Sequence, residues 1–147
     1  MAEHTDKRTA TQAASWPKTA SCICGGLTAT VAAPPQMTHA CSCLDCQRGT
    51  GSAFSYSAFF AEDAVRSSGE ARRYRRPSDA GRWQETNFCP VCGVCVLTRL
   101  EALPGLVGVS VGCFADPTFE KPQKLYWTVS RHHWLDTLSG VEPVDTQ

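Results

Sequence analysis

The sequence predicts a mainly β fold made of short strands and long loops. β-branched and aromatic residues gather in short runs, and glycine and proline separate these runs throughout the 147-residue chain. Helical periodicity is scarce and confined to two short segments. At this length the chain most simply forms one domain with a substantial buried core.

Six segments carry the strand signal. In FSYSAFF (54–60) aromatic and small residues alternate, which suits a strand with one buried face. Separately from these six, the arginine-rich run RRYRR (72–76) is expected to be an ordinary exposed strand, because alternation would divide its arginines between two faces. The six segments are 27–31, 54–60, 82–88, 94–100, 106–114 and 124–130.

Two segments carry the helical signal. DCQRGTG (45–51) has room for a turn or two, and RHHWLDTL (131–138) predicts a short C-terminal helix with Ser130 as its N-cap. Residues 1–18 offer no periodic apolar face and are expected to form a flexible tail. We therefore expect a domain over 19–139 and a second tail over 140–147.

The charge balance gives no sign of a nucleic-acid or membrane-surface partner. Basic and acidic residues number 14 each, and 19% of the residues are charged. No apolar run approaches the roughly 18 residues of a membrane-spanning helix, and the first residues lack the apolar stretch of a secretory signal. We therefore expect a cytoplasmic protein whose cysteines stay as free thiols or metal ligands.

Nine cysteines are unusual in a chain of this size. The number is odd, and pairs such as Cys22/Cys24 and Cys41/Cys43 are too close along an extended chain for ordinary disulfide geometry. Metal binding is the better interpretation. Seven of the cysteines form three clusters, which are Cys22-x-Cys24, Cys41-x-Cys43-x-x-Cys46 and Cys89-x-x-Cys92.

The first and third clusters predict a closed zinc site. Structural zinc is usually held by four thiolates that come as two short pairs from distant parts of the chain. Each pair here is followed by a glycine, Gly25 or Gly93, which allows backbone amides to turn toward the sulfurs. The predicted ligands are Cys22, Cys24, Cys89 and Cys92.

The middle cluster predicts a zinc ion with an open coordination position. Three protein ligands and a free fourth position are typical of catalytic zinc, and a three-thiolate site readily accepts a further sulfur. A thiol bound there would lose its proton near neutral pH and become a nucleophile. The predicted catalytic ligands are Cys41, Cys43 and Cys46.

Other assignments stay open at this point. His39 or Asp45 could complete a second structural site, and the seven cysteines could divide differently between the two ions. As a non-ligand, His39 could instead hydrogen-bond a cysteine sulfur. Cys95 and Cys113 lie in apolar runs and are expected to be small buried residues.

In this order the motifs resemble those of the glutathione-dependent formaldehyde-activating enzyme family, which includes the centromere protein V group. The match consists of CICG (22–25), CSCLDC (41–46) with Gly51, and FCPVCG (88–93). The stretches PGLVGVSVGCFADP (104–117) and SRHHWLD (130–136) are similar to two further segments of the family.

The resemblance implies an Mss4-like β fold of small antiparallel sheets, with two zinc ions, one structural and one catalytic, on the two predicted cysteine sets. It implies a carbon–sulfur lyase whose partners are small molecules, with glutathione as the thiol and formaldehyde as the electrophile. Arg48 is the expected partner for a glutathione carboxylate. The alternatives are an enzyme for another thiol conjugate or electrophile, and a non-catalytic zinc module that binds protein or nucleic acid.

Overall fold

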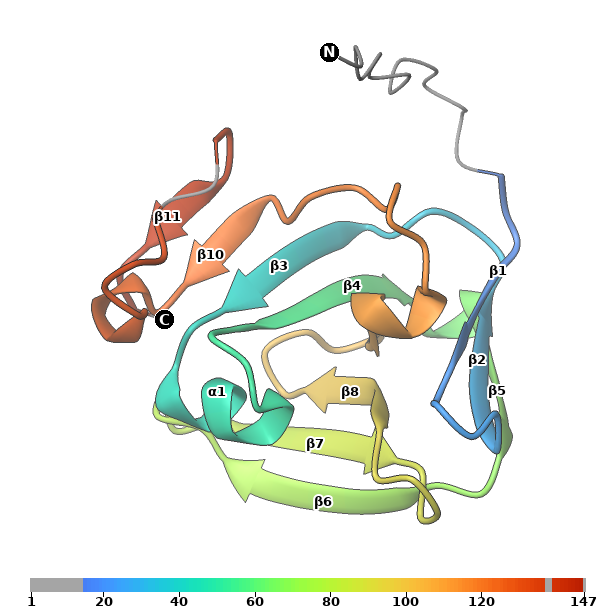
Figure 1. The fold of residues 1–147 in the computed structure, drawn as a ribbon. Helices are drawn as coiled ribbons and strands as arrows, with labels where there is room; N and C mark the ends of the chain where they lie inside the picture. Colours follow the sequence, from blue (N-terminus) through green and yellow to red (C-terminus); the bar gives the residue numbers. More distant parts are fainter. Residues whose placement is uncertain (1–14, 137–138, 147) are drawn as a thin grey trace, which may run out of the picture.

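The computed structural model describes residues 15–136 and 139–146. Within these residues the chain forms two β-sheets joined by loops (Figure 1), and the mainly β prediction is confirmed. The strands are β1 (Lys18–Ser21), β2 (Leu27–Val31), β3 (Met37–Cys41), β4 (Ser55–Ala61), β5 (Val65–Gly69), β6 (Arg72–Pro77), β7 (Trp83–Phe88), β8 (Cys95–Leu100), β9 (Leu106–Ser110), β10 (Lys124–Tyr126) and β11 (Glu142–Val144). The helices are α1 (Leu44–Thr50) and the 3₁₀ turns η1 (Glu62–Ala64), η2 (Val111–Phe114) and η3 (Thr128–Ser130).

The two sheets differ in size and in strand direction. The smaller sheet has the order β1-β2-β5 and is antiparallel throughout. The larger sheet has the order β11-β10-β3-β4-β9-β8-β7-β6, and its strands are antiparallel except where β10 runs parallel to both β3 and β11. Figure 1 shows α1 directly after β3, at the end of the molecule where β6 and β7 also pass.

Alternation along the strands builds the main core between the sheets. In β2 the buried and half-buried positions alternate, so Leu27, Ala29 and Val31 all point to one face. These residues join a cluster contributed by the larger sheet. Its buried members from that sheet are Ala58, Phe60, Val96, Leu97, Val107 and Val109.

The opposite face of the larger sheet carries several short polar residues among larger apolar ones. β3 directs His39 and Cys41 to this face, and β4 directs Ser55 and Ser57 to it. His39 pairs with Ser57 in the register, and Cys41 pairs with Ser55. Because serine side chains are short, they leave space above the strands, and the functional site described below lies in this space.

Most of the predicted elements are confirmed, some with altered ends. The segment 27–31 is β2, and 54–60, 82–88 and 94–100 match β4, β7 and β8 within a residue at each end. The segments 106–114 and 124–130 begin as β9 and β10 but finish in η2 and η3. The exposed strand expected at the arginine run is β6, and the predicted helix at 45–51 is α1.

The predicted C-terminal helix at 131–138 is wrong for the residues described, 131–136. After η3 the backbone at Arg131 is extended, and the Leu135 N–H closes a single turn onto the His132 carbonyl. Two histidines and a tryptophan are weak helix formers, and the turn is enough to bury Leu135. Residues 137 and 138 lie outside the described residues.

Both predicted tails include parts of the domain. Residues 1–14 lie outside the described residues, but Trp16 packs edge-on against Phe60 at 5.9 Å, and β1 begins at Lys18. At the other end, β11 lies within the segment 140–147, because its parallel pairing with β10 extends the larger sheet by one strand. Among the described residues, no helix has the length and apolar character that a membrane span requires.

Candidate functional site

The structure brings the first and third cysteine clusters together. The sulfurs of Cys22, Cys24, Cys89 and Cys92 all lie within 4.8 Å of one another. The Cys24 Sγ lies 3.6 Å from both the Cys22 and Cys89 sulfurs. Four sulfurs at zinc–sulfur distances of about 2.3 Å in a tetrahedron are separated by about 3.8 Å, so this set has the dimensions that zinc requires.

Two tight turns present these four sulfurs. Gly25 and Gly93 both have a positive φ, 77° and 75°, a conformation that glycine adopts without strain. The Gly25 N–H donates to the Cys22 carbonyl at 3.0 Å, and the Gly93 N–H donates to the Cys89 carbonyl at 2.9 Å. The glycine after each cysteine pair therefore closes its turn.

The middle cluster forms a second, separate set at the junction of β3 and α1. The sulfurs of Cys41, Cys43 and Cys46 also lie within 4.8 Å of one another. Cys43 is the N-cap residue of α1, and its sulfur accepts a hydrogen bond from the Cys46 N–H at 3.3 Å. One six-residue segment therefore places all three sulfurs, and the alternative in which these cysteines join the other set is wrong for this structure.

The three sulfurs compete for negative charge. Hydrogen bonds from Cys41, Cys46 and nearby backbone amides lower the pKa of Cys43 to about 2, whereas hydrogen bonding to Cys43 is the main cause that raises the pKa of Cys41. One thiolate thus suppresses ionisation of its neighbour. A bound cation such as zinc would relieve this repulsion, so the donor set fits a soft metal ion.

The described residues supply no fourth ligand to this set. Asp45 is engaged elsewhere, since its carboxylate pairs with Arg76 at 2.8 Å and with Arg48 at 3.3 Å. His39 lies on the same face as Cys41 but is not among the atoms within reach of the three sulfurs. The structure therefore gives no support to a closed second site completed by either residue.

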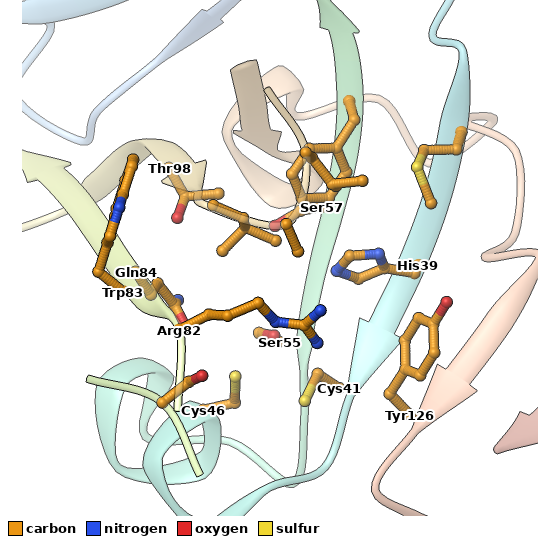
Figure 2. Close-up of a pocket in the computed structure, with 16 residues that line it drawn as sticks. His39, Cys41, Cys46, Ser55, Ser57, Arg82, Trp83, Gln84, Thr98 and Tyr126 are labelled. Atoms are coloured by element: carbon orange, nitrogen blue, oxygen red, sulfur yellow. The ribbon is translucent and has the colours of Figure 1, made fainter. Parts of the chain in front are cut away.

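A cavity of about 300 Å³ lies beside this set, on the small-residue face of the larger sheet. Figure 2 shows Cys41 and Cys46 on one side of the cavity and Thr98 across from them. Gly108 of β9 lies between Phe59 and Thr98 in the register, and a Cβ there would be only 2.5 Å from the Thr98 methyl carbon. Because Gly108 has no side chain, Phe59 and Thr98 can pack on either side of it, and these two residues form the floor of the cavity.

His39 is one of the buried polar residues of this cavity. Its imidazole packs between Phe59 and Tyr126, with ring centroids 4.7 and 5.2 Å away. Its Nδ1 is buried without a hydrogen-bond partner, and burial lowers the pKa of His39 to about 4, so the ring is neutral near pH 7. The sequence places His39 two residues before Cys41, and strand alternation is the signal that puts both on one face.

Two cationic residues besides the predicted Arg48 lie near the site. The Arg48 side chain is 74% exposed on α1 and does not line the cavity. Arg82 lines the cavity, and Arg76 lines a smaller hollow on the other side of the three cysteines. Arg76 belongs to the arginine run, but its proximity to the cysteines depends on the long-range ion pair with Asp45.

Cys95, Cys113 and His132 do not line the cavity. Cys95 and Cys113 are half-buried, and the Cys113 sulfur lies 3.7 Å from the Cys95 carbonyl oxygen. Burial raises the pKa of both thiols, which favours the unreactive protonated form. The His132 Nε2 lies 3.0 Å from the Gln47 side-chain oxygen, so this residue links the C-terminal segment to α1.

Fold and site together define a class of protein: a mainly β domain with one complete cysteine set and one three-cysteine set that borders a cavity. The family model of the glutathione-dependent formaldehyde-activating enzyme matches residues 17–130. The chain belongs to this family, as its cysteine motifs predicted. At the level of the family, this membership supports chemistry that involves glutathione and formaldehyde.

The fold is also found in a solved structure. The chain is similar to the crystal structure of a Rhodobacter sphaeroides protein, a structural-genomics target, with a TM-score of 0.52 and 19% sequence identity. The similarity covers 65% of this chain and 85% of that chain. At this identity the likeness shows a shared fold and no more. Among the curated proteins, none matches the chain significantly.

Proposed function

We propose that the chain is a zinc-dependent carbon–sulfur lyase that adds a thiol, glutathione in the first instance, to an aldehyde such as formaldehyde, or runs this reaction in reverse. The supporting observation is the three-cysteine set, which has no fourth protein ligand among the described residues and borders a cavity. In the addition, a carbon–sulfur bond forms between the thiolate and the carbonyl carbon. The π electrons of the carbonyl move to its oxygen, which takes up the proton that the thiol gave up.

The two cysteine sets have different roles in this proposal. Cys22, Cys24, Cys89 and Cys92 hold a structural zinc that joins the β1–β2 turn to the β7–β8 turn. Zinc on Cys41, Cys43 and Cys46 would supply an open position at which a thiol ionises near neutral pH. Cys41 and Cys46 line the cavity, so a thiol beside them faces the space available to the aldehyde.

The charged residues around the three cysteines suit a thiol that carries carboxylates. Arg76 lines the hollow formed with the three cysteines, and Arg82 stands at the cavity. Guanidinium groups bind carboxylates through paired, charge-assisted hydrogen bonds. Arg48 shares the Asp45 carboxylate with Arg76 and is the third candidate for this contact.

Native mass spectrometry under reducing conditions tests the proposal, with glutathione present or absent. We expect two zinc ions per chain and a glutathione adduct that Cys43→Ser removes together with one zinc. In parallel, exchange NMR with ¹³C-formaldehyde should show faster interconversion with S-hydroxymethylglutathione. A protein that holds two zinc ions but shows neither the adduct nor the acceleration would refute the proposed lyase activity. Salt-dependent DNA binding by such a protein would favour a binding module.

A further inference from the structure

Two hollows meet at the three-cysteine set, and they differ in the charged side chains that line them. The smaller hollow, of about 40 Å³, is lined beside the cysteines by Arg76, Asp79 and Gln84. The larger one is the 300 Å³ cavity. Cys41 and Cys46 line both. A sulfur held at this set is therefore bordered by charged side chains on one side and by the cavity on the other.

The walls of the cavity are mainly apolar. Of the 16 residues that line it, Arg82 is the one with a full charge; this residue is exposed, and Figure 2 shows its side chain extending across the cavity toward Ser55 and Cys41. Glutathione carries two carboxylates and an ammonium group, and burying these groups without partners is strongly unfavourable. The charged groups of the tripeptide are therefore better matched by Arg76 and Asp79 at the smaller hollow, which at about 40 Å³ holds only a small part of the molecule. The apolar walls are formed by Met37, Phe59, Trp83, Leu100, Leu103 and the ring of Tyr126.

The cavity is also much larger than formaldehyde needs. A water molecule occupies about 30 Å³ in the liquid, and formaldehyde has only two non-hydrogen atoms. A cavity of about 300 Å³ accommodates roughly six to ten non-hydrogen atoms at a similar volume each. Filling it with an apolar group would displace water from the surrounding side chains, which favours binding.

The imidazole of His39, two residues before Cys41, gives the cavity a polar end near the cysteines. The His39 side chain is enclosed by the cavity floor, the residue is 8% exposed, and Nδ1 has no partner within the protein. Figure 2 shows the imidazole between Ser57 and Tyr126, on the same strand as Cys41. Because Nδ1 is fully buried, a ligand oxygen close to the cysteines would meet the other imidazole nitrogen, Nε2, at the part of His39 that lines the cavity.

We propose that the electrophile is an aldehyde with an apolar alkyl or aryl group of about five to eight carbons, seated in the cavity with its oxygen at His39. This inference rests on the proposed function and names its substrate class. The reaction is the same addition: the thiolate sulfur bonds the carbonyl carbon, the oxygen receives the electron pair and the thiol proton, and nothing is oxidised or reduced.

The test compares aldehydes of increasing size with glutathione and the zinc-loaded protein. Formaldehyde, acetaldehyde, butanal, hexanal and phenylacetaldehyde are followed by exchange NMR, and each rate is divided by its uncatalysed rate. Each buried methylene contributes roughly a fourfold gain in binding. We expect the acceleration to rise from formaldehyde to hexanal by about 100-fold, allowing for incomplete burial of the chain.

A bulky substitution in the cavity wall provides the matched variant. Leu103 is half-buried in the loop between β8 and β9, so Leu103→Trp fills the cavity without altering a strand. We expect it to lower the hexanal-to-formaldehyde ratio by about 15-fold, from the loss of three of the five added carbons at about 2.5-fold each. Tyr74→Trp on the exposed edge strand β6 introduces the same residue away from the cavity and should leave the ratio unchanged.

The outcomes separate this inference from the proposed function. Acceleration of formaldehyde alone would overturn the larger substrate and leave the lyase intact. Acceleration of no aldehyde by a protein with two zinc ions would overturn both. If Leu103→Trp does not fold, the series of aldehydes on the unaltered protein still decides: an acceleration that is flat or falls with chain length contradicts the inference.

Discussion

Replacing Cys43 by serine should separate metal binding from folding. Cys43 has two roles, since its sulfur belongs to the three-cysteine set and also caps α1 through the Cys46 N–H. Serine is among the best N-cap residues but is a poor zinc ligand beside thiolates. Cys43→Ser should therefore lose the second zinc and the lyase activity, while α1 keeps its cap.

The magnitude follows from comparing Cys43→Ser with Cys43→Ala. Alanine cannot accept the capping hydrogen bond, which costs about 1 kcal/mol. For a domain of this size that corresponds to a difference in Tm of roughly 2–4 °C. Both variants lack the metal ligand, so the difference in Tm between them measures the contribution of the capping hydrogen bond alone.

Cys89→Ser is the contrasting variant. Cys89 is 1% exposed, and its set joins two turns that are 65 residues apart in the sequence. Structural zinc contributes about 10–16 kcal/mol in small zinc peptides, which is comparable with the whole stability of a domain, about 5–15 kcal/mol. We expect Cys89→Ser to be largely unfolded at 25 °C.

Zinc content by native mass spectrometry and unfolding in urea followed by tryptophan fluorescence measure these effects. The expected order of stability is the unaltered protein, then Cys43→Ser, then Cys43→Ala, with Cys89→Ser far below. Equal loss of structure in Cys43→Ser and Cys89→Ser would refute the division into a structural and an open set.

Three further substitutions test the fold around the site. Gly108→Ala places a Cβ 2.5 Å from Thr98 and 2.8 Å from Phe59. We expect the free energy of unfolding in urea to fall by about 1–3 kcal/mol and the cavity to become smaller. An unchanged free energy of unfolding would contradict this. Gly69→Ala combines a φ of 96° with a Cβ 1.8 Å from the Gly26 carbonyl oxygen, so a larger loss, above about 3 kcal/mol, should appear in the same assay. Asp45→Asn removes the ion pair with Arg76 and should cost about 1 kcal/mol at low salt; an equal cost in 1 M NaCl would argue against an electrostatic cause.

Some strands could be predicted from the pattern of residues within their own sequence. β2 alternates clearly, because it has one face in the core and one outside it. β4 was predicted from its alternating aromatic and small residues, but in the structure its central residues are buried on both faces. β3 and β11 were missed for different reasons. β3 contains His39 and ends in a predicted metal ligand, so its strand character depends on pairing with β4 and β10. β11 has a proline at its centre, which argues against a strand unless it lies at a sheet edge, as here.

The cysteine sets could be predicted because ligand spacing is a local property, whereas the cavity could not. Its walls come from β3, β4, β7, β8 and β10, and their order in the sheet depends on long-range pairing. For the same reason Arg48, adjacent to the cysteines in sequence, was predicted in place of Arg82. Only His39 carried a local signal, its two-residue spacing from Cys41 within a strand.

The separation of the ligands along the chain explains why the two sets suit different roles. A bond between turns 65 residues apart restricts the unfolded chain strongly, so an ion at the first set stabilises the fold. The three cysteines of the second set lie within six residues, where the unfolded chain loses little freedom on binding an ion. Coordination there adds little to folding, and exchange of a ligand at that ion would not threaten the domain. An open position that repeatedly binds and releases a thiol is therefore best placed on the local set, beside the cavity.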